Sequence, residues 1–118
     1  MNFNSFDEGE CVLTAQKHCA CIEFVLNENE RHGFAISQLL HYHLEPNPSH
    51  DFEAPPERMI LAFTTADVVL LGWRLGRLAN KLRDGELLAA RTLPPRYANI
   101  DPAKTSVASI TVVPVNKG

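Results

Sequence analysis

Features that mark a secreted or membrane protein are missing from this sequence. The three cysteines, Cys11, Cys19 and Cys21, are odd in number and too few for a disulfide scaffold. No apolar run approaches the roughly 18 residues that a membrane-spanning helix needs. The first ten residues are polar and acidic, unlike the basic and apolar parts of a secretory signal. We therefore expect reduced thiols, a cytoplasmic protein and no membrane partner.

Motifs of common catalytic and nucleic-acid-binding proteins are also missing. The chain has no glycine-rich loop that would cradle a phosphate, no helix-turn-helix pattern and no series of stacking aromatic residues. Neither Cys19 nor Cys21 lies in a glycine-rich or helix-start context that would supply an oxyanion hole. These absences favour a non-enzymatic protein.

The segment from residue 58 to residue 93 organises the rest of the chain. Residues 60–63 and 68–71 are short apolar runs, and the residues between them include two threonines and an aspartate. Such residues suit a strand end and a turn, so the pattern predicts a β-hairpin.

A helix is expected directly after this hairpin. Beyond Gly72 the period changes from two residues to about 3.6, and four leucines recur at spacings of four, three and four: Leu71, Leu75, Leu78 and Leu82. Gly85 can adopt positive φ and end the helix. The leucine side of this helix is predicted to pack on a sheet.

Further strands are expected where apolar residues alternate or cluster, at residues 10–15, 19–27, 34–45 and 105–115. One more strand is expected between the helix and residue 93. Gln38 interrupts the apolar side of the longest of them. Proline cannot donate a hydrogen bond to a strand ladder, so the proline-bearing residues 46–57 and 94–104 are predicted to be loops. Residues 1–9 are expected to form a frayed end.

These elements predict an α+β fold. We expect a strongly bent antiparallel sheet, or a small open β-barrel, of about seven strands with one helix packed against it. With 118 residues, of which 45% are hydrophobic, the chain is long enough for one core. Residues 1–118 are therefore predicted to form a single compact domain.

Four side chains suggest a metal site: Cys19, Cys21, His41 and His43. If residues 19–27 and 34–45 paired as a hairpin, the two thiols would lie opposite the two imidazoles, and such a set suits Zn²⁺. A second interpretation is a reactive thiol activated by His41. The third is a half-exposed sheet face that carries small and polar residues without a ligand.

Three basic residues, Arg74, Arg77 and Lys81, lie on a neighbouring face of the predicted helix. Such a face can bind the phosphates of a small ligand or of a nucleic acid. The alternatives are a solvated basic surface and a contact with another protein. Without a nucleic-acid-binding motif, we favour a protein partner over nucleic acid.

Charge is distributed unevenly along the chain. Residues 1–57 hold ten acidic and two basic residues, a net charge of −8, whereas residues 58–118 hold nine basic and four acidic residues, a net charge of +5. Opposite surfaces of this kind favour self-association, unless the charges interleave in the folded chain. We therefore expect an interaction module that forms a homodimer or binds an unidentified protein partner. The alternative functions are the zinc or thiol site and the phosphate site described above.

Overall fold

The computed structural model describes residues 6–15, 19–49 and 52–115. These residues form eight β-strands, one α-helix and two short 3-10 helices. The strands are β1 (Val12–Thr14), β2 (Cys21–Asn27), β3 (Glu30–Ala35), β4 (Leu39–Pro46), β5 (Glu57–Phe63), β6 (Ala66–Trp73), β7 (Leu87–Arg91) and β8 (Ser106–Pro114). The helices are η1 (Ile36–Gln38), α1 (Leu75–Arg83) and η2 (Pro95–Asn99).

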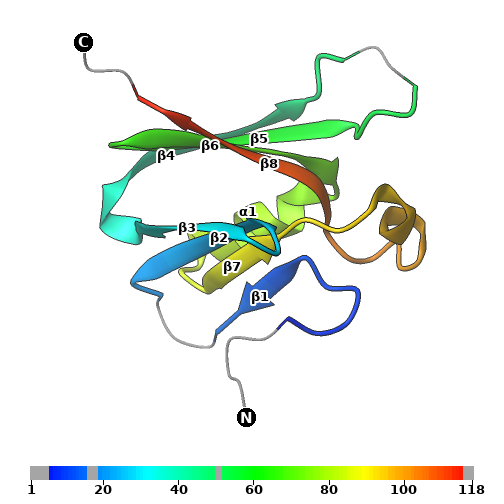
Figure 1. The fold of residues 1–118 in the computed structure, drawn as a ribbon, viewed down its shortest axis with the longest axis horizontal. Helices are drawn as coiled ribbons and strands as arrows, with labels where there is room; N and C mark the ends of the chain where they lie inside the picture. The colour runs from blue at the N-terminus through cyan, green and yellow to red at the C-terminus, as the bar shows by residue number, and fades with distance from the viewer. Residues whose placement is uncertain (1–5, 16–18, 50–51, 116–118) are drawn as a thin grey trace.

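The strands form two four-stranded sheets that lie as two layers (Figure 1). Sheet A has the strand order β1-β7-β2-β3, and sheet B has the order β4-β5-β6-β8. Neighbouring strands run antiparallel, except that β2 and β7 are parallel. The chain is thus a small α+β domain with largely antiparallel sheets. The prediction of one bent sheet or open barrel of about seven strands is wrong, because the strands divide between two sheets.

The division arises within residues 34–45, which the sequence pattern presents as one strand. There η1 separates β3 from β4 and carries the chain from one sheet to the other. The Ile36 N–H donates to the carbonyl of Ala20 (2.8 Å), and the Thr64 N–H donates to the carbonyl of Gln38 (2.9 Å). The Thr64 hydroxyl also donates to the side-chain oxygen of Gln38 (2.6 Å). Gln38, which interrupts the alternation, therefore belongs to the corner between the sheets.

Helix α1 confirms the prediction made from leucine spacing, except that Leu71 belongs to β6. Leu75, Leu78 and Leu82 are all buried, and α1 contacts β4 and β5 of sheet B and β7 of sheet A. Burial of each such side chain contributes about 1.5–3 kcal/mol of transfer free energy. Gly85 follows the helix with a φ of 75°, as a terminating glycine should. No helix in the described ranges has the length and apolar character needed to cross a membrane.

A residue from β5 holds the start of α1. Arg74, just before the helix, has a left-handed φ of 57° and provides no side-chain cap. Instead, a carboxylate oxygen of Glu57 accepts the Leu75 N–H at 2.6 Å. This contact satisfies a helix N–H that has no partner within the helix and places negative charge at the positive end of the helix dipole.

The two sheets meet through aromatic side chains. Phe24 of β2 and Phe34 of β3 both contact Phe63 of β5, with ring centroids 6.2 Å and 4.4 Å apart, respectively. Phe24 and Phe63 are at most 1% exposed. The core therefore lies between the layers, and α1 packs into it from one open side.

Candidate functional site

The structure does not bring the predicted zinc ligands together. Cys19 and Cys21 lie just before and at the start of β2, and β2 pairs with β3 rather than with β4. His41 and His43 lie on β4, opposite Ala62 and Ile60 of β5 in sheet B. The predicted hairpin is therefore wrong, because the corner at η1 moves the histidines into the other layer. In the described part of the chain, no three His, Cys, Asp or Glu residues are grouped to hold a metal ion, so the zinc hypothesis stays a prediction from sequence alone.

The environments of Cys11 and Cys19 give little support to thiol chemistry at these two residues. Cys11 is 1% exposed, and its sulfur accepts the Val107 N–H at 3.3 Å. Burial raises the pKa of the Cys11 thiol. Partial burial, and then the charge of Glu86, raise the pKa of Cys19. A raised pKa favours the protonated thiol, which is not the nucleophilic form.

Arg74, the first member of the predicted basic face, has a structural role. Its guanidinium donates to the carbonyl oxygens of Ala98 (2.6 Å), Asp101 (3.4 Å) and Lys104 (2.5 Å). The Thr105 hydroxyl donates to the Arg74 carbonyl at 2.8 Å. Arg74 therefore fixes the segment between η2 and β8 to the start of α1, where its Nε and Nη2 groups donate to backbone carbonyl oxygens.

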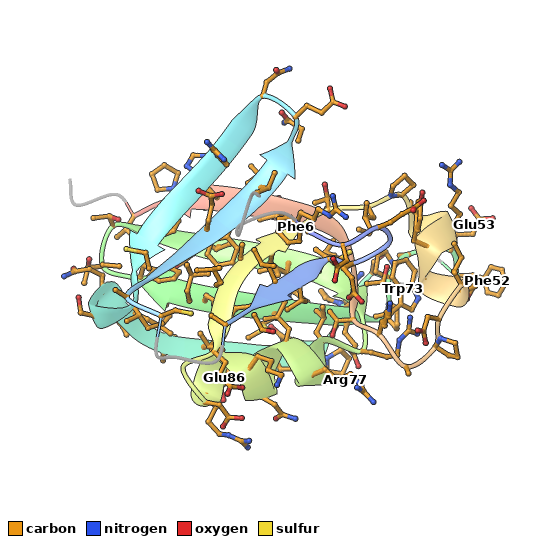
Figure 2. The ribbon with its side chains drawn as sticks, turned by 90° about the horizontal axis from the view of Figure 1, so that it is seen from below. Phe6, Phe52, Glu53, Trp73, Arg77 and Glu86 are labelled. Atoms are coloured by element: carbon orange, nitrogen blue, oxygen red, sulfur yellow. The ribbon has the colours of Figure 1, made fainter. Side chains whose placement is uncertain are left out.

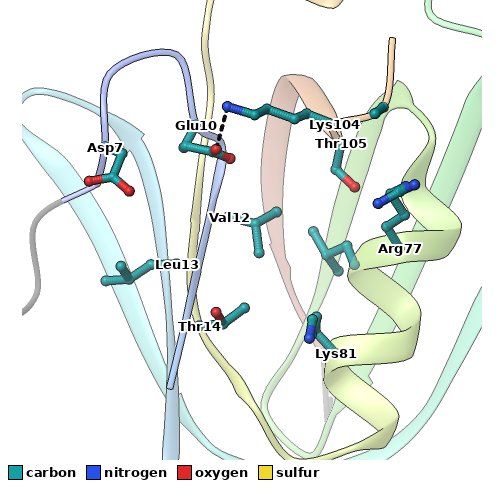
Figure 3. A pocket seen from close by; sticks show the side chains of 11 residues that line it. Asp7, Glu10, Val12, Leu13, Thr14, Arg77, Lys81, Lys104 and Thr105 are labelled. Atoms are coloured by element: carbon teal, nitrogen blue, oxygen red, sulfur yellow. Dashed lines mark ion pairs between the residues drawn. The ribbon is translucent and has the colours of Figure 1, made fainter. Parts of the chain in front are cut away.

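Arg77 and Lys81, the other two members, line a cavity of about 360 Å³ between α1 and β1. Figure 2 shows Arg77 projecting from α1. Lys104 closes one end of the cavity, where its ammonium lies 2.6 Å from a carboxylate oxygen of Glu10 (Figure 3). The structure thus separates Arg74 from the other two residues and adds Lys104 to them.

Arg91 fixes the opposite wall of this cavity. Its guanidinium donates to the carbonyl oxygens of Glu10 (2.7 Å) and Asp7 (2.9 Å) and lies 4.7 Å from the ring centre of Phe6. Asp7 and Glu10 both line the cavity. No local pattern in the sequence places Lys104 and β1 beside α1, because both lie more than twenty residues away from this helix along the chain.

Edge strand β4 exposes three large apolar side chains. Leu40, Tyr42 and Leu44 are 65%, 41% and 40% exposed, respectively. Tyr42 lies opposite Leu61 and Leu44 lies opposite Met59, and both of these β5 residues are fully buried. Leu40 lies at a register shift and has no opposite residue in β5. The core-facing side of sheet B therefore continues onto β4, where water reaches it.

The other edge strands differ from β4: β1 is short, β3 carries charged residues, and β8 is hydrogen-bonded to another segment. β1 has only three residues, and β3 carries the exposed charged residues Glu30 and Arg31. The first part of β8 is joined to the segment after β7 by the Leu93 N–H, which donates to the Val107 carbonyl at 3.0 Å, and β8 ends at Pro114. Charged residues and proline protect sheet edges from pairing. β4 contains no lysine or arginine, its Glu45 pairs with Arg58 of β5, and its proline is at its last position.

Among the described residues, two ion pairs join the acidic half of the chain to the basic half. Arg58 pairs with Glu45 at 2.8 Å, and Lys104 pairs with Glu10 at 2.6 Å. Each pair joins a residue of the acidic half to a residue of the basic half. The charge split therefore gives weaker support to self-association than β4 does.

Comparisons of the chain with protein-family models, with curated proteins and with solved structures give no match. Neither a family nor a relative therefore suggests a function. The features that bear on function are β4 and the cavity between β1 and α1.

Proposed function

We propose that this protein is a non-enzymatic interaction module that forms a homodimer through β4. The observation that carries the proposal is the exposure of Leu40, Tyr42 and Leu44 on an unprotected edge strand. Removing apolar surface from water contributes about 25 cal/mol per Å². A second strand would also pair with the outward backbone N–H and C=O groups of β4.

The sequence of β4 is suited to pairing with itself. In an antiparallel pair with a two-fold axis opposite Tyr42, Leu40 lies opposite Leu44 of the second copy, and Tyr42 lies opposite its own counterpart. Alternate residues of a strand share one side, so Tyr42 and Leu44 of both copies lie on one apolar face. Leu40 lies at the register shift with β5, where alternation does not assign its side. The contact is isologous, which is the usual symmetry of a homodimer. It would join the two copies of sheet B into one continuous sheet.

Sedimentation equilibrium tests this proposal. At roughly 0.1 mM protein, we expect a mass near twice the 13.1 kDa of the chain. The variant Tyr42→Lys places a lysine opposite its own counterpart, and like charges directly opposite each other destabilise strand pairing. It should therefore sediment as a monomer with an unchanged circular dichroism spectrum.

Ile100→Lys provides the matched control. Ile100 is 69% exposed, but it lies directly after η2 and outside both sheets. This variant introduces the same charge and should remain dimeric. A wild-type chain that is monomeric at this concentration contradicts self-association. A dimer that survives Tyr42→Lys shows that another surface forms the contact.

A further inference from the structure

The cavity between β1 and α1 has the size and lining of a small-ligand site. Its volume of about 360 Å³ is at the lower end of the range for such sites. Val12 and Leu78 provide apolar lining, and Figure 3 shows Val12 and Thr14 on the side of β1 that faces α1, whereas Leu13 lies on its other side. The two walls come from segments that Arg91 and Arg74 fix in place, so the cavity is a built feature of the fold.

Three cations surround this cavity: Arg77, Lys81 and Lys104. The guanidinium of Arg77 makes no hydrogen bond or ion pair with any residue in the described ranges. Lys81 pairs with Glu86 at 3.2 Å, and Lys104 pairs with Glu10 at 2.6 Å. All three cationic side chains are at least partly exposed to solvent. Arg77 is thus a cation at the cavity that has no partner among the residues the structure describes.

The hydrogen-bond donors that a ligand in this cavity could use lie on or near α1. Arg77 and Lys81 are separated by one helical turn on α1, and the Thr14 hydroxyl lies on the facing strand. The Thr105 hydroxyl has already donated to the Arg74 carbonyl, so it can act only as an acceptor. Charge-assisted hydrogen bonds from guanidinium and ammonium groups are the strongest contacts that such a site can make with an anion.

We infer that this cavity binds a small phosphorylated molecule, with its phosphate held by Arg77 and Lys81. A dianionic phosphate supplies the acceptors that these two cations need. An extended nucleic acid fits the site poorly, because Asp7 and Glu10 at the opposite wall would repel its continuing chain of phosphates. This inference is independent of the proposed dimer, since β4 contributes nothing to the lining of the cavity.

Titration with inorganic pyrophosphate, followed by the ¹H–¹⁵N spectrum of the full-length chain, tests this site. Sodium chloride in the reference sample keeps the ionic strength matched, because screening alone alters surface electrostatics. We expect saturable shifts in the amides of residues 12–14, 77–81 and 103–105, with a dissociation constant of about 1 mM or lower.

Variants that each remove one positive charge from α1, inside or outside the cavity, show whether the cavity binds the pyrophosphate. Arg77→Gln and Lys81→Gln should each weaken pyrophosphate binding by about tenfold, the loss expected for one charge-assisted hydrogen bond. Arg83→Gln removes a cation from the same helix, but Arg83 is exposed, pairs with Asp84 and lies outside the cavity. Its affinity for pyrophosphate should remain that of the wild type.

Two results would overturn the inference. One is the absence of saturable shifts at about 10 mM pyrophosphate. The other is an equal loss of affinity in Arg83→Gln, which would show a diffuse attraction between anions and the basic helix. The mass measured by sedimentation bears on neither result, so this site and the proposed dimer can fail separately.

Discussion

Gly72→Ala should be strongly destabilising, although it adds only one methyl group. Gly72 lies near the end of β6, beside a register shift with β8. A Cβ atom at this position would lie 2.1 Å from the carbonyl oxygen of Ser106 and 3.1 Å from Leu75 Cδ2. The first distance is far below any normal contact, and the neighbouring atom belongs to the backbone. The two strands would therefore have to move apart.

The size of the loss in stability depends on how firmly β8 is held beside Gly72. Its Val107 N–H donates to the Cys11 sulfur (3.3 Å), and its Val107 carbonyl accepts the Leu93 N–H (3.0 Å). A shift of β8 therefore also disturbs contacts with β1 and with the segment after β7. Overpacking of this kind costs about 3 kcal/mol or somewhat more. In a domain of this size, that cost corresponds to a fall in Tm of about 12 °C.

Urea unfolding at equilibrium measures this loss, and Gly76→Ala is its matched control. The added Cβ at Gly76 would meet no atom within 4 Å, and alanine is the better helix former by about 0.5–1 kcal/mol. Gly76→Ala should therefore raise the free energy of unfolding while Gly72→Ala lowers it. A change of less than about 1 kcal/mol in Gly72→Ala would show that β6 and β8 do not approach as closely as described.

Three further predictions concern residues that hold the elements together. Arg74→Lys retains the charge but loses the planar set of donors, so it should cost about 2 kcal/mol and increase amide hydrogen exchange in residues 95–105. Glu57→Ala should cost about 1 kcal/mol in urea unfolding, because the Leu75 N–H loses its acceptor. Glu57→Gln keeps an acceptor for this N–H and should lose only the part of the stabilisation that comes from the carboxylate charge. The folded state holds the Cys11 proton more tightly than the unfolded state does, since burial raises the pKa of this thiol. Stability should therefore fall as the pH rises above the ordinary thiol pKa of 9.0; Cys11→Ala should show a smaller fall, and equal slopes in the two proteins would refute this assignment.

Local patterns in the sequence were sufficient to predict the hairpin of β5 and β6, the helix and the final strand. Leu75, Leu78 and Leu82 indicated the buried side of α1, because a helix brings residues three and four apart onto one face. Gly85 indicated its end. Each of these inferences depends on residues close together in the chain, where backbone geometry alone decides which side chains are neighbours.

The division of the strands between two sheets could not be predicted in this way. A period of two residues shows which side of a strand is apolar, but it does not show which strand lies beside it. Apart from Gln38, residues 34–45 kept that period across the corner at η1, so they appeared as a single strand. The zinc hypothesis failed to gain a ligand set for the same reason: it required β2 to pair with the strand that carries His41 and His43.

The candidate sites show the same limit. The sequence by itself determined that Arg77 and Lys81 share a helix face and that β4 is rich in apolar residues, because both facts depend on spacing along one element. Only the tertiary structure decided that Arg74 binds backbone carbonyls, that Lys104 joins the other two cations and that β4 lies at an edge. These outcomes depend on contacts between segments distant in sequence, and such contacts are set by the packing of the whole core rather than by any local pattern.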